Sequence, residues 1–160
     1  MEDKLRNALR APIELSWKPS NKFGDKLMCV CYLDSRDIQD RLDDVVGVAG
    51  WQTKFISQAG KLFCELSLKI DNEWITKSDV GIDTQVAADK GAASDALKRA
   101  AVHFGIGRFT YEVDSVLVSF TTFRRGSKDV DTPTNSQGQK LYGQKLSNYI
   151  NQNFDKLSKV

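Results

Sequence analysis

A row of basic side chains in the segment KGAASDALKRAAVHFGIGRF could bind phosphate groups. Lys90, Ser94 and Lys98 follow one another four residues apart, so on a helix they lie along one side, with Arg99 next to them. Ammonium and guanidinium groups in such a row can hold the backbone of a nucleic acid. The alternative is a solvated helix face on which Asp95 and Arg99 form a weak ion pair. The helix alone does not decide between the two.

His103 and a group of aspartates are the side chains that we weighed as a catalytic or metal site. His103, the one histidine, falls near the end of the same helix, where packing or the helix dipole explains it better than catalysis. Asp37, Asp40, Asp43 and Asp44 could be imagined as a magnesium site. Asp37, Asp40 and Asp44 form a stripe opposite Ile38 and Leu42, however, which favours the solvated side of an amphipathic helix. We therefore expect no enzyme activity, no metal and no cofactor.

Cysteine usage and hydropathy restrict the setting of the protein. Cys29, Cys31 and Cys64 lack the paired spacing of a metal knuckle, so buried free thiols are predicted. No stretch approaches the ~20 consecutive apolar residues of a membrane span, and the charged start MEDK is unlike a signal peptide. A cytoplasmic protein without membrane contact is expected.

The charge is distributed unevenly along the chain. The net charge is only +2, but residues 31–89 carry 6 basic and 11 acidic side chains, whereas residues 90–160 carry 11 basic and 6 acidic ones. A basic second half indicates either a solvated surface or a nucleic-acid groove. Charge alone leaves both open.

The first part of the chain alternates helices with extended segments. A short amphipathic helix is predicted to end at Pro12, followed by a connector that contains Trp17 and Pro19. The apolar run LMCVCYL predicts a strand buried on both faces. A second helix is capped by Asp34 or Ser35 and ends near Gly47.

From Gly50 the hydrophobic period changes to two, which predicts an antiparallel meander. A hairpin turns near Ala59-Gly60, and Asp71-Asn72 leads into a third strand around Trp74–Val80. One face of the middle strand is apolar and should be covered, and its members are Leu62, Cys64, Leu66, Leu68 and Ile70. Some of the aromatic side chains here could stack on bases while others fill the core, namely Trp51, Phe55, Phe63 and Trp74.

The second half is predicted as helix, strand, loop and helix. Asp83 or Thr84 can cap a long alanine-rich helix that reaches about His103. A strand is expected from about Tyr111 to Phe123, a mobile loop over residues 124–138, and an amphipathic helix over 139–158, in which Tyr142 begins the apolar stripe.

The segment KGAASDALKRAAVHFGIGRF resembles the signature of the Rad52 superfamily of single-strand DNA annealing proteins, especially its DdrA-like and phage Sak-like branches. The resemblance extends through CYLDSRDIQDRLDDVVGVAGW and DVGID and covers about residues 10–112. It implies a β-β-β-α core that assembles into rings or filaments and holds single-stranded DNA in a basic outer groove, with the bases facing solvent for pairing.

The resemblance also suggests individual DNA contacts. Lys98 and Arg99 match the basic doublet that grips the strand in the family, and Lys90 matches a basic position at the start of the same helix. Arg36 falls near an arginine between strand and helix that faces the groove, and Lys69 resembles a second contact position. Arg108 is added because it follows the doublet closely.

These observations predict one α+β domain over residues 1–160, with a core over about 10–123. An antiparallel meander packs on the alanine-rich helix, and the terminal helices contact neighbouring protomers of a homo-oligomer. The expected function is annealing of complementary strands in recombination and repair, in a bacterial cell or a phage-infected host. A single-strand-binding protein or an exonuclease is a candidate partner. The alternatives are protection of 3′ DNA ends without pairing, and an interaction scaffold that binds no DNA.

Overall fold

The structure is a computed structural model that describes residues 2–82 and 88–160, with the backbone alone for residues 88–90. The chain forms two compact units. The first unit comprises the residues up to Ile13 together with Leu33–Phe109, and the second comprises Glu14–Tyr32 and Thr110–Val160. Both combine helices with antiparallel strands, which confirms the α+β class. The single domain over residues 1–160 stays a prediction.

The described residues contain four α-helices and eight strands. The helices are α1 (Glu2–Arg10), α2 (Ser35–Val46), α3 (Ala88–His103) and α4 (Gly143–Asn153), with 3-10 helices at Arg108–Glu112 and Phe154–Lys156. The strands are β1 (Ser16–Phe23), β2 (Lys26–Tyr32), β3 (Trp51–Gln58), β4 (Lys61–Ile70), β5 (Glu73–Val80), β6 (Val116–Val118), β7 (Phe120–Arg125) and β8 (Lys128–Pro133). None of the helices described is long and apolar enough to cross a membrane.

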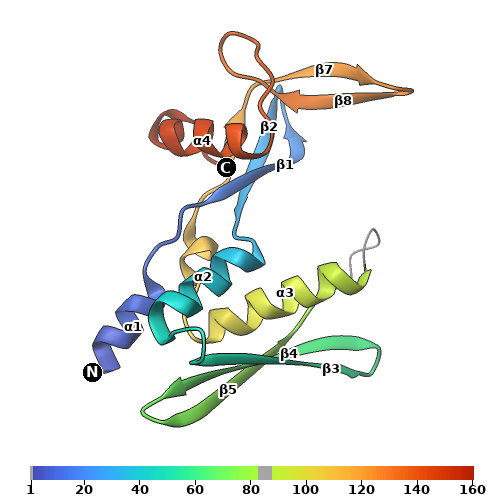
Figure 1. The fold of residues 1–160 in the computed structure, drawn as a ribbon. Coiled ribbons are helices and arrows are strands. Elements are labelled where there is room, and N and C mark those ends of the chain that lie inside the picture. Colours follow the sequence, from blue (N-terminus) through green and yellow to red (C-terminus); the bar gives the residue numbers. More distant parts are fainter. Residues whose placement is uncertain (1, 83–87) are drawn as a thin grey trace. The chain divides into compact units, whose positions relative to one another are not determined.

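The first unit is built on the predicted meander, in the strand order β3-β4-β5. Asp71 and Asn72 adopt φ values of 49° and 68° in the turn between β4 and β5, a conformation that Asn and Asp tolerate better than most residues. Helix α3 packs along β4 and β5, and α2 packs on α3 (Figure 1). Cys64, Leu66 and Leu68 on β4 are fully buried, as the alternation predicted.

Helix α2 has the predicted boundaries. The Asp34 side chain accepts hydrogen bonds from the backbone N–H groups of Arg36 and Asp37, while the Asp37 carboxylate accepts from the Asp34 N–H, which completes a capping box. Gly47 ends the helix at φ 80°, where a side chain would be strained. Asp34 rather than Ser35 is therefore the cap.

Hydrogen bonds from an arginine side chain to the backbone hold α1 beside α2. The Arg41 guanidinium on α2 donates to the carbonyl oxygens of Ala8, Ala11 and Pro12, at 3.0, 2.6 and 3.2 Å. The Ala8 carbonyl belongs to the last turn of α1, and those of Ala11 and Pro12 follow it, so no helical partner remains for them. The arginine therefore stabilises the end of the helix.

The second unit is a separate small core. Its sheet has the order β1-β2-β6, and α4 packs against β1 (Figure 1). Trp17 is 1% exposed, its ring N–H donates to Asn151 Oδ1 at 2.7 Å, and its backbone N–H donates to Ser147 Oγ at 2.9 Å. Around it lie apolar residues of the sheet, of α4 and of the segment that enters α4, namely Cys29, Val116, Val118, Leu141, Leu146 and Ile150.

The predicted connector around Trp17 and Pro19 was wrong, because residues 16–23 form β1. The polar sequence SWKPSNKF buries only Trp17 fully, so the strand lacks a clear alternation. Pro19 is tolerated because β1 is an edge strand, and the register shifts between Pro19 and Lys22.

The region after α3 also differs from the prediction. Instead of one strand over 111–123, a 3-10 helix at Arg108–Glu112 precedes β6 and β7. The predicted loop over 124–138 contains β8, which pairs with β7 across a turn at Gly126. The last helix is shorter than 139–158, and Tyr142 precedes it and is 57% exposed. Lys, Asp and Pro make up four of the six residues of β8 and are depleted in strands, so the propensity of β8 alone does not predict this hairpin.

Candidate nucleic-acid interface

Helix α3, which carries the predicted DNA contacts, packs through small side chains. Ala96, Ala100 and Ala101 are fully buried and Ala92 is 2% exposed. Small side chains permit the backbone of a neighbouring element to approach closely. Gly81 directly follows β5. A Cβ added there would lie 2.1 Å from the Ala92 carbonyl oxygen, so only glycine fits. This packing sets the position of the basic residues on the helix.

The doublet Lys98-Arg99 lies on the partly exposed side of α3. The Arg99 Nε–H donates to Asp95 Oδ2 at 2.8 Å, and the same oxygen accepts from the Ile82 N–H at 2.9 Å. This confirms the Asp95–Arg99 pair that the spacing suggested. Within the described part of the chain, no residue forms a hydrogen bond or ion pair with the Lys98 ammonium. The carboxylate therefore orients one member of the doublet, while the other keeps its hydrogen-bond donors for solvent or a ligand.

Asp95 stays ionised beside the doublet. Partial burial alone would raise the pKa of its carboxyl, but the hydrogen bonds from Arg99 and from the Ile82 N–H, with the charges of Arg99 and Lys98, together lower that pKa below the ordinary value of 3.8. The carboxylate cancels part of the charge of the doublet. What remains is a cationic spot with a fixed guanidinium, which suits a phosphate better than a neutral ligand.

Arg36 lies in the first turn of α2, in the same unit as the doublet. Its side chain is 83% exposed, and its guanidinium contacts the Asp34 carboxylate at 3.4 Å. A pair this exposed contributes little to stability and can be exchanged for a phosphate at small cost. Because α2 packs on α3, the two elements that carry Arg36 and the doublet are neighbours.

Lys69 is exposed and lies across from Trp74 of β5, on the face of the meander opposite α3. Because side chains alternate along β4, Lys69 shares this open face with Phe63, while Leu66 and Leu68 point to the helix. The aromatic side chains of the meander differ in the same way in what they contact. Trp74 is 44% exposed, whereas Trp51 donates from its ring N–H to Asp43 at 2.7 Å. Lys69 and the doublet thus belong to opposite sides of the sheet.

Arg108 and His103 stabilise the end of α3. The Arg108 guanidinium donates to the carbonyl of Val102 at 2.7 and 3.2 Å and to that of His103 at 3.3 Å. The His103 ring is 49% exposed and contacts the Asp79 carboxylate of β5 at 3.0 Å, which joins the end of α3 to the sheet. The side chain of Lys90 and the proposed caps Asp83 and Thr84 lie outside the described residues.

Comparison with known proteins identifies the sequence family. Residues 1–125 match the model of the Rad52/22 family of double-strand break repair proteins. The chain belongs to the Rad52/22 family. Two curated proteins named single-stranded DNA-binding protein DdrA are similar to it. The one from Deinococcus radiodurans is 33% identical over 131 residues, and the one from Deinococcus deserti is 30% identical over 128 residues.

These alignments cover 78% and 76% of the chain but only 62% and 63% of the two relatives. The chain therefore spans less than two thirds of the length of either protein. The match to the Rad52/22 family includes the whole first unit and every site residue named from the sequence. It ends at the last residue of β7.

One basic surface was not identified from the sequence. Arg124, Arg125 and Lys140 of the second unit line a common hollow. The consecutive arginines and the nearby Lys128 were visible as a basic run, but the segment was predicted as a loop. Without the β7–β8 pairing, nothing in the sequence brings Lys140 close to them.

Proposed function

We propose that this Rad52/22-family chain binds single-stranded DNA and pairs complementary strands during homologous recombination and repair in the bacterial cytoplasm. The observation that supports this most directly is the Lys98-Arg99 doublet on α3, inside the unit that the family model matches throughout. The names of the DdrA relatives support the choice of ligand.

Annealing requires a surface of this kind rather than an active site. Lys and Arg hold phosphates without reading sequence, which leaves the base edges free to pair. The fixed guanidinium of Arg99, the ammonium of Lys98 and the exposed Arg36 supply such contacts on neighbouring helices. No bond is made or broken, so no nucleophile, metal or cofactor is needed.

A homo-oligomeric ring or filament is part of the proposal. The order β3-β4-β5 leaves one side of β3 and one side of β5 without a partner strand in the described unit. Unpaired strand edges promote association with further chains. Val48 and Ile82 add exposed apolar side chains, 76% and 56% exposed. Light scattering after gel filtration should give a mass several times the 17.9 kDa of the chain, and a monomer at micromolar concentration would contradict assembly.

The doublet is tested by replacing Lys98 and Arg99 together with alanine. Two labelled complementary oligonucleotides are mixed with the protein, and pairing is followed against a protein-free control over a salt series. We expect the protein-dependent part of the pairing rate, after subtraction of the protein-free rate, to fall at least about tenfold. The slope of log affinity against log salt should become about 1.4 shallower, because each phosphate contact on a single strand contributes roughly 0.7.

The matched control replaces Lys4 and Lys61, two exposed lysines of the first unit that are not part of α3, so that the charge changes equally. Circular dichroism and gel filtration verify that each variant keeps its fold and mass. Wild-type annealing by a well-folded doublet variant would contradict the proposed site.

Binding without pairing is the second candidate, because the relatives are named for single-stranded DNA binding alone. Protection of 3′ ends would be such an activity. If the protein binds oligonucleotides tightly and slows a 3′ exonuclease but leaves the pairing rate at the protein-free value, end protection replaces annealing as the function.

A further inference from the structure

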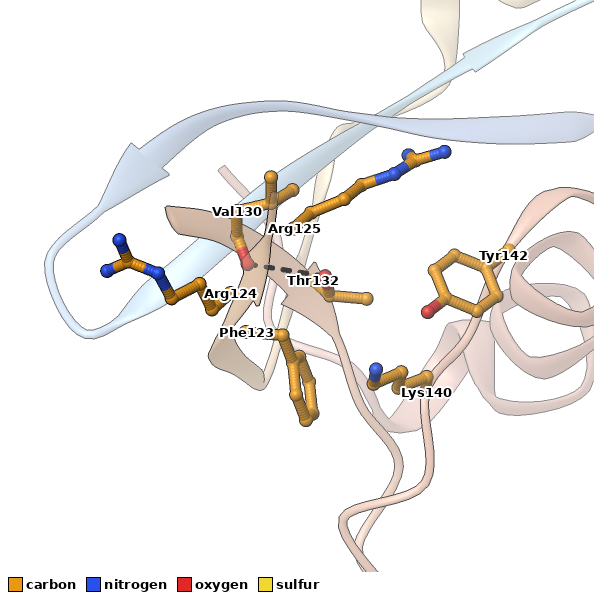
Figure 2. Close-up of a pocket in the computed structure, with 7 residues that line it drawn as sticks. All are labelled: Phe123, Arg124, Arg125, Val130, Thr132, Lys140 and Tyr142. Carbon is orange, nitrogen blue, oxygen red and sulfur yellow. Dashed lines mark hydrogen bonds between the residues drawn. The ribbon is translucent and has the colours of Figure 1, made fainter. Parts of the chain in front are cut away.

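A hollow of about 480 Å³ lies in the second unit between the β7–β8 hairpin and the segment that enters α4 (Figure 2). Its walls are formed by Phe123, Arg124, Arg125, Val130, Thr132, Lys140 and Tyr142. The Leu141 N–H donates to the Pro133 carbonyl at 2.9 Å, and Thr134 pairs with Lys140 as an isolated bridge. The two walls are therefore joined by backbone hydrogen bonds and do not depend on long side chains.

The charge of the hollow is positive. Three of its lining side chains are cationic and none is acidic. Arg124 contacts Asp129 at 3.9 Å, but the two side chains are 74% and 66% exposed, so this contact neutralises little. Among the described residues, none forms a hydrogen bond or ion pair with the Arg125 guanidinium. Asp131 lies on the opposite face of the hairpin, where its carboxylate forms an ion pair with the Lys22 ammonium at 2.9 Å.

The hollow also offers apolar and aromatic surface. The Lys140 Nζ lies 3.9 Å from the centroid of the Phe123 ring, so a cation–π contact places the ammonium at the wall. Val130 is 38% exposed, and Tyr142 is 57% exposed although it is a large aromatic side chain. Figure 2 shows the two arginines extending in opposite directions from the hairpin, with Tyr142 on the side of Arg125. Cations are thus spread along the rim rather than focused on one point.

We infer that this hollow is a second contact for single-stranded nucleic acid. Arg125 and Lys140 hold backbone phosphates, and Tyr142 stacks on a base, while Phe123 and Val130 form the apolar wall. Combined cations and exposed aromatic rings are what a flexible polyanion with stacked bases requires. The inference rests on the proposed function and extends it to the second unit, beyond residue 125 where the family match ends.

An acidic peptide is the competing ligand for a basic hollow. The cations alone would suffice to bind the carboxylates of an acidic peptide, and such a ligand would make no use of an exposed tyrosine ring at the rim. The spread of Arg124 and Arg125 to both sides of the hairpin also favours a strand that passes over it, since its phosphates continue in both directions. The observations therefore favour the nucleic acid, and the peptide becomes an outcome of the test.

The test titrates labelled oligo(dT) with the full chain by fluorescence anisotropy over a salt series. We expect Arg125→Ala with Lys140→Ala to make the slope of log affinity against log salt about 1.4 shallower. Tyr142→Ala should weaken binding about tenfold without changing that slope, and Tyr142→Phe should retain wild-type affinity, because stacking needs the ring and not the hydroxyl. Lys145→Ala with Lys156→Ala, an equal charge change in the same unit outside the hollow, is the matched control.

A position-specific readout separates this inference from the proposed function. Photocrosslinking to 5-iodouracil oligonucleotides, followed by trypsin, should modify the peptide Leu141–Lys145, which contains Tyr142. If the Lys98 and Arg99 variant loses DNA binding while both hollow variants bind as wild type and this peptide stays unmodified, the second contact is overturned and the first stands. If the hollow variants lose affinity while the doublet variant does not, the inference holds and the proposed site fails. If they lose only binding to a labelled oligo-aspartate peptide, the hollow binds protein and the inference is overturned.

Discussion

The arginines of the first unit mostly contact the protein itself, whereas those of the second unit line an open hollow. Arg99 binds a carboxylate, Arg41 binds three carbonyls at the end of α1, and Arg108 binds the carbonyls at the end of α3. Arg124 and Arg125 have at most one distant, exposed partner each among the described residues. Counting basic residues along a sequence therefore does not locate a nucleic-acid surface. The atoms that each cation already contacts decide which ones remain for phosphate.

The cores of the two units differ as well. The first unit buries alanines of α3 against a sheet, while the second surrounds one large side chain, Trp17, with the residues of α4 and β1. A helix that packs through alanine holds its exposed residues at a short, fixed height above the sheet. A core built around one tryptophan depends on that residue. The two units should accordingly respond differently to core substitutions.

The largest effect is expected from Trp17→Ala. Removing this side chain deletes its burial, its hydrogen bond to Asn151 and its contact with the Phe154 ring, whose centroid is 5.7 Å away. The free energy of unfolding of the second unit should fall by about 3 to 5 kcal/mol. Urea titration with alkylation and mass spectrometry can follow each unit, since Cys29 is buried in the second and Cys64 in the first. Burial raises the pKa of both thiols to about 11, so the folded protein resists alkylation at pH 8.

In Trp17→Ala, Cys29 should become reactive at lower urea than in wild type, while Cys64 keeps its midpoint. Trp17→Phe retains a ring beside Phe154 and should give a smaller shift. Simultaneous exposure of both thiols would mean that the two units unfold together, and their cores would then not respond separately to substitutions.

An intermediate effect is expected from Ala100→Leu, and it should destabilise the first unit rather than the second. Ala100 is fully buried in α3, and three extra carbons force the helix away from its neighbours at a cost of about 1 to 3 kcal/mol. Cys64 should now be the thiol that reacts earlier. Annealing should fall with it, because the doublet beside Ala100 is displaced. Ala93→Leu, at a partly exposed position of the same helix, is the control, and equal effects of the two would show that α3 is not held by close packing.

Most elements of the first unit could be predicted because their signals are local. The alternation of β4, the turns at Ala59-Gly60 and Asp71-Asn72, and the ends of α2 follow from spacing and from residues suited to caps and positive φ. Strand β1 could not be predicted in the same way, because its one buried residue, Trp17, packs against α4, which follows more than a hundred residues later. Long-range packing leaves no period in a polar segment.

The candidate site was predictable where a helix repeats its spacing. The Asp95–Arg99 contact follows from positions four apart, and the structure contains it. The capping role of Arg108 could not be foreseen, because it depends on how the chain turns after α3. The hollow depends on the pairing of β7 with β8, which sets Phe123 opposite Val130 and brings the chain back past Lys140. The polar sequence of β8 carries only a weak strand signal, so its pairing with β7 is not visible in the sequence.

The smallest effect is expected from Asp95→Asn, and it depends on pH. The pKa of Asp95 is lowered on folding, so its ionised form stabilises the folded state fully above the unfolded pKa near 3.8, and this contribution is lost as the pH falls through the folded pKa. The substitution should lower the free energy of unfolding by about 0.5 to 1 kcal/mol at pH 7, a small figure because Arg99 is 35% exposed. Asparagine does not titrate, so the difference in Tm between variant and wild type should narrow below about pH 4.

Asp129→Asn removes an exposed carboxylate that contacts Arg124 at 3.9 Å, and it should leave Tm unchanged at every pH. A Tm difference for Asp95→Asn that stays constant from pH 7 to pH 3.5 would show that the carboxylate charge does not hold Arg99. Because Asp95 also cancels part of the charge of the doublet, the same variant should bind oligo(dT) slightly more tightly at pH 7. Weaker binding would instead mean that orienting the guanidinium matters more than the net charge beside it.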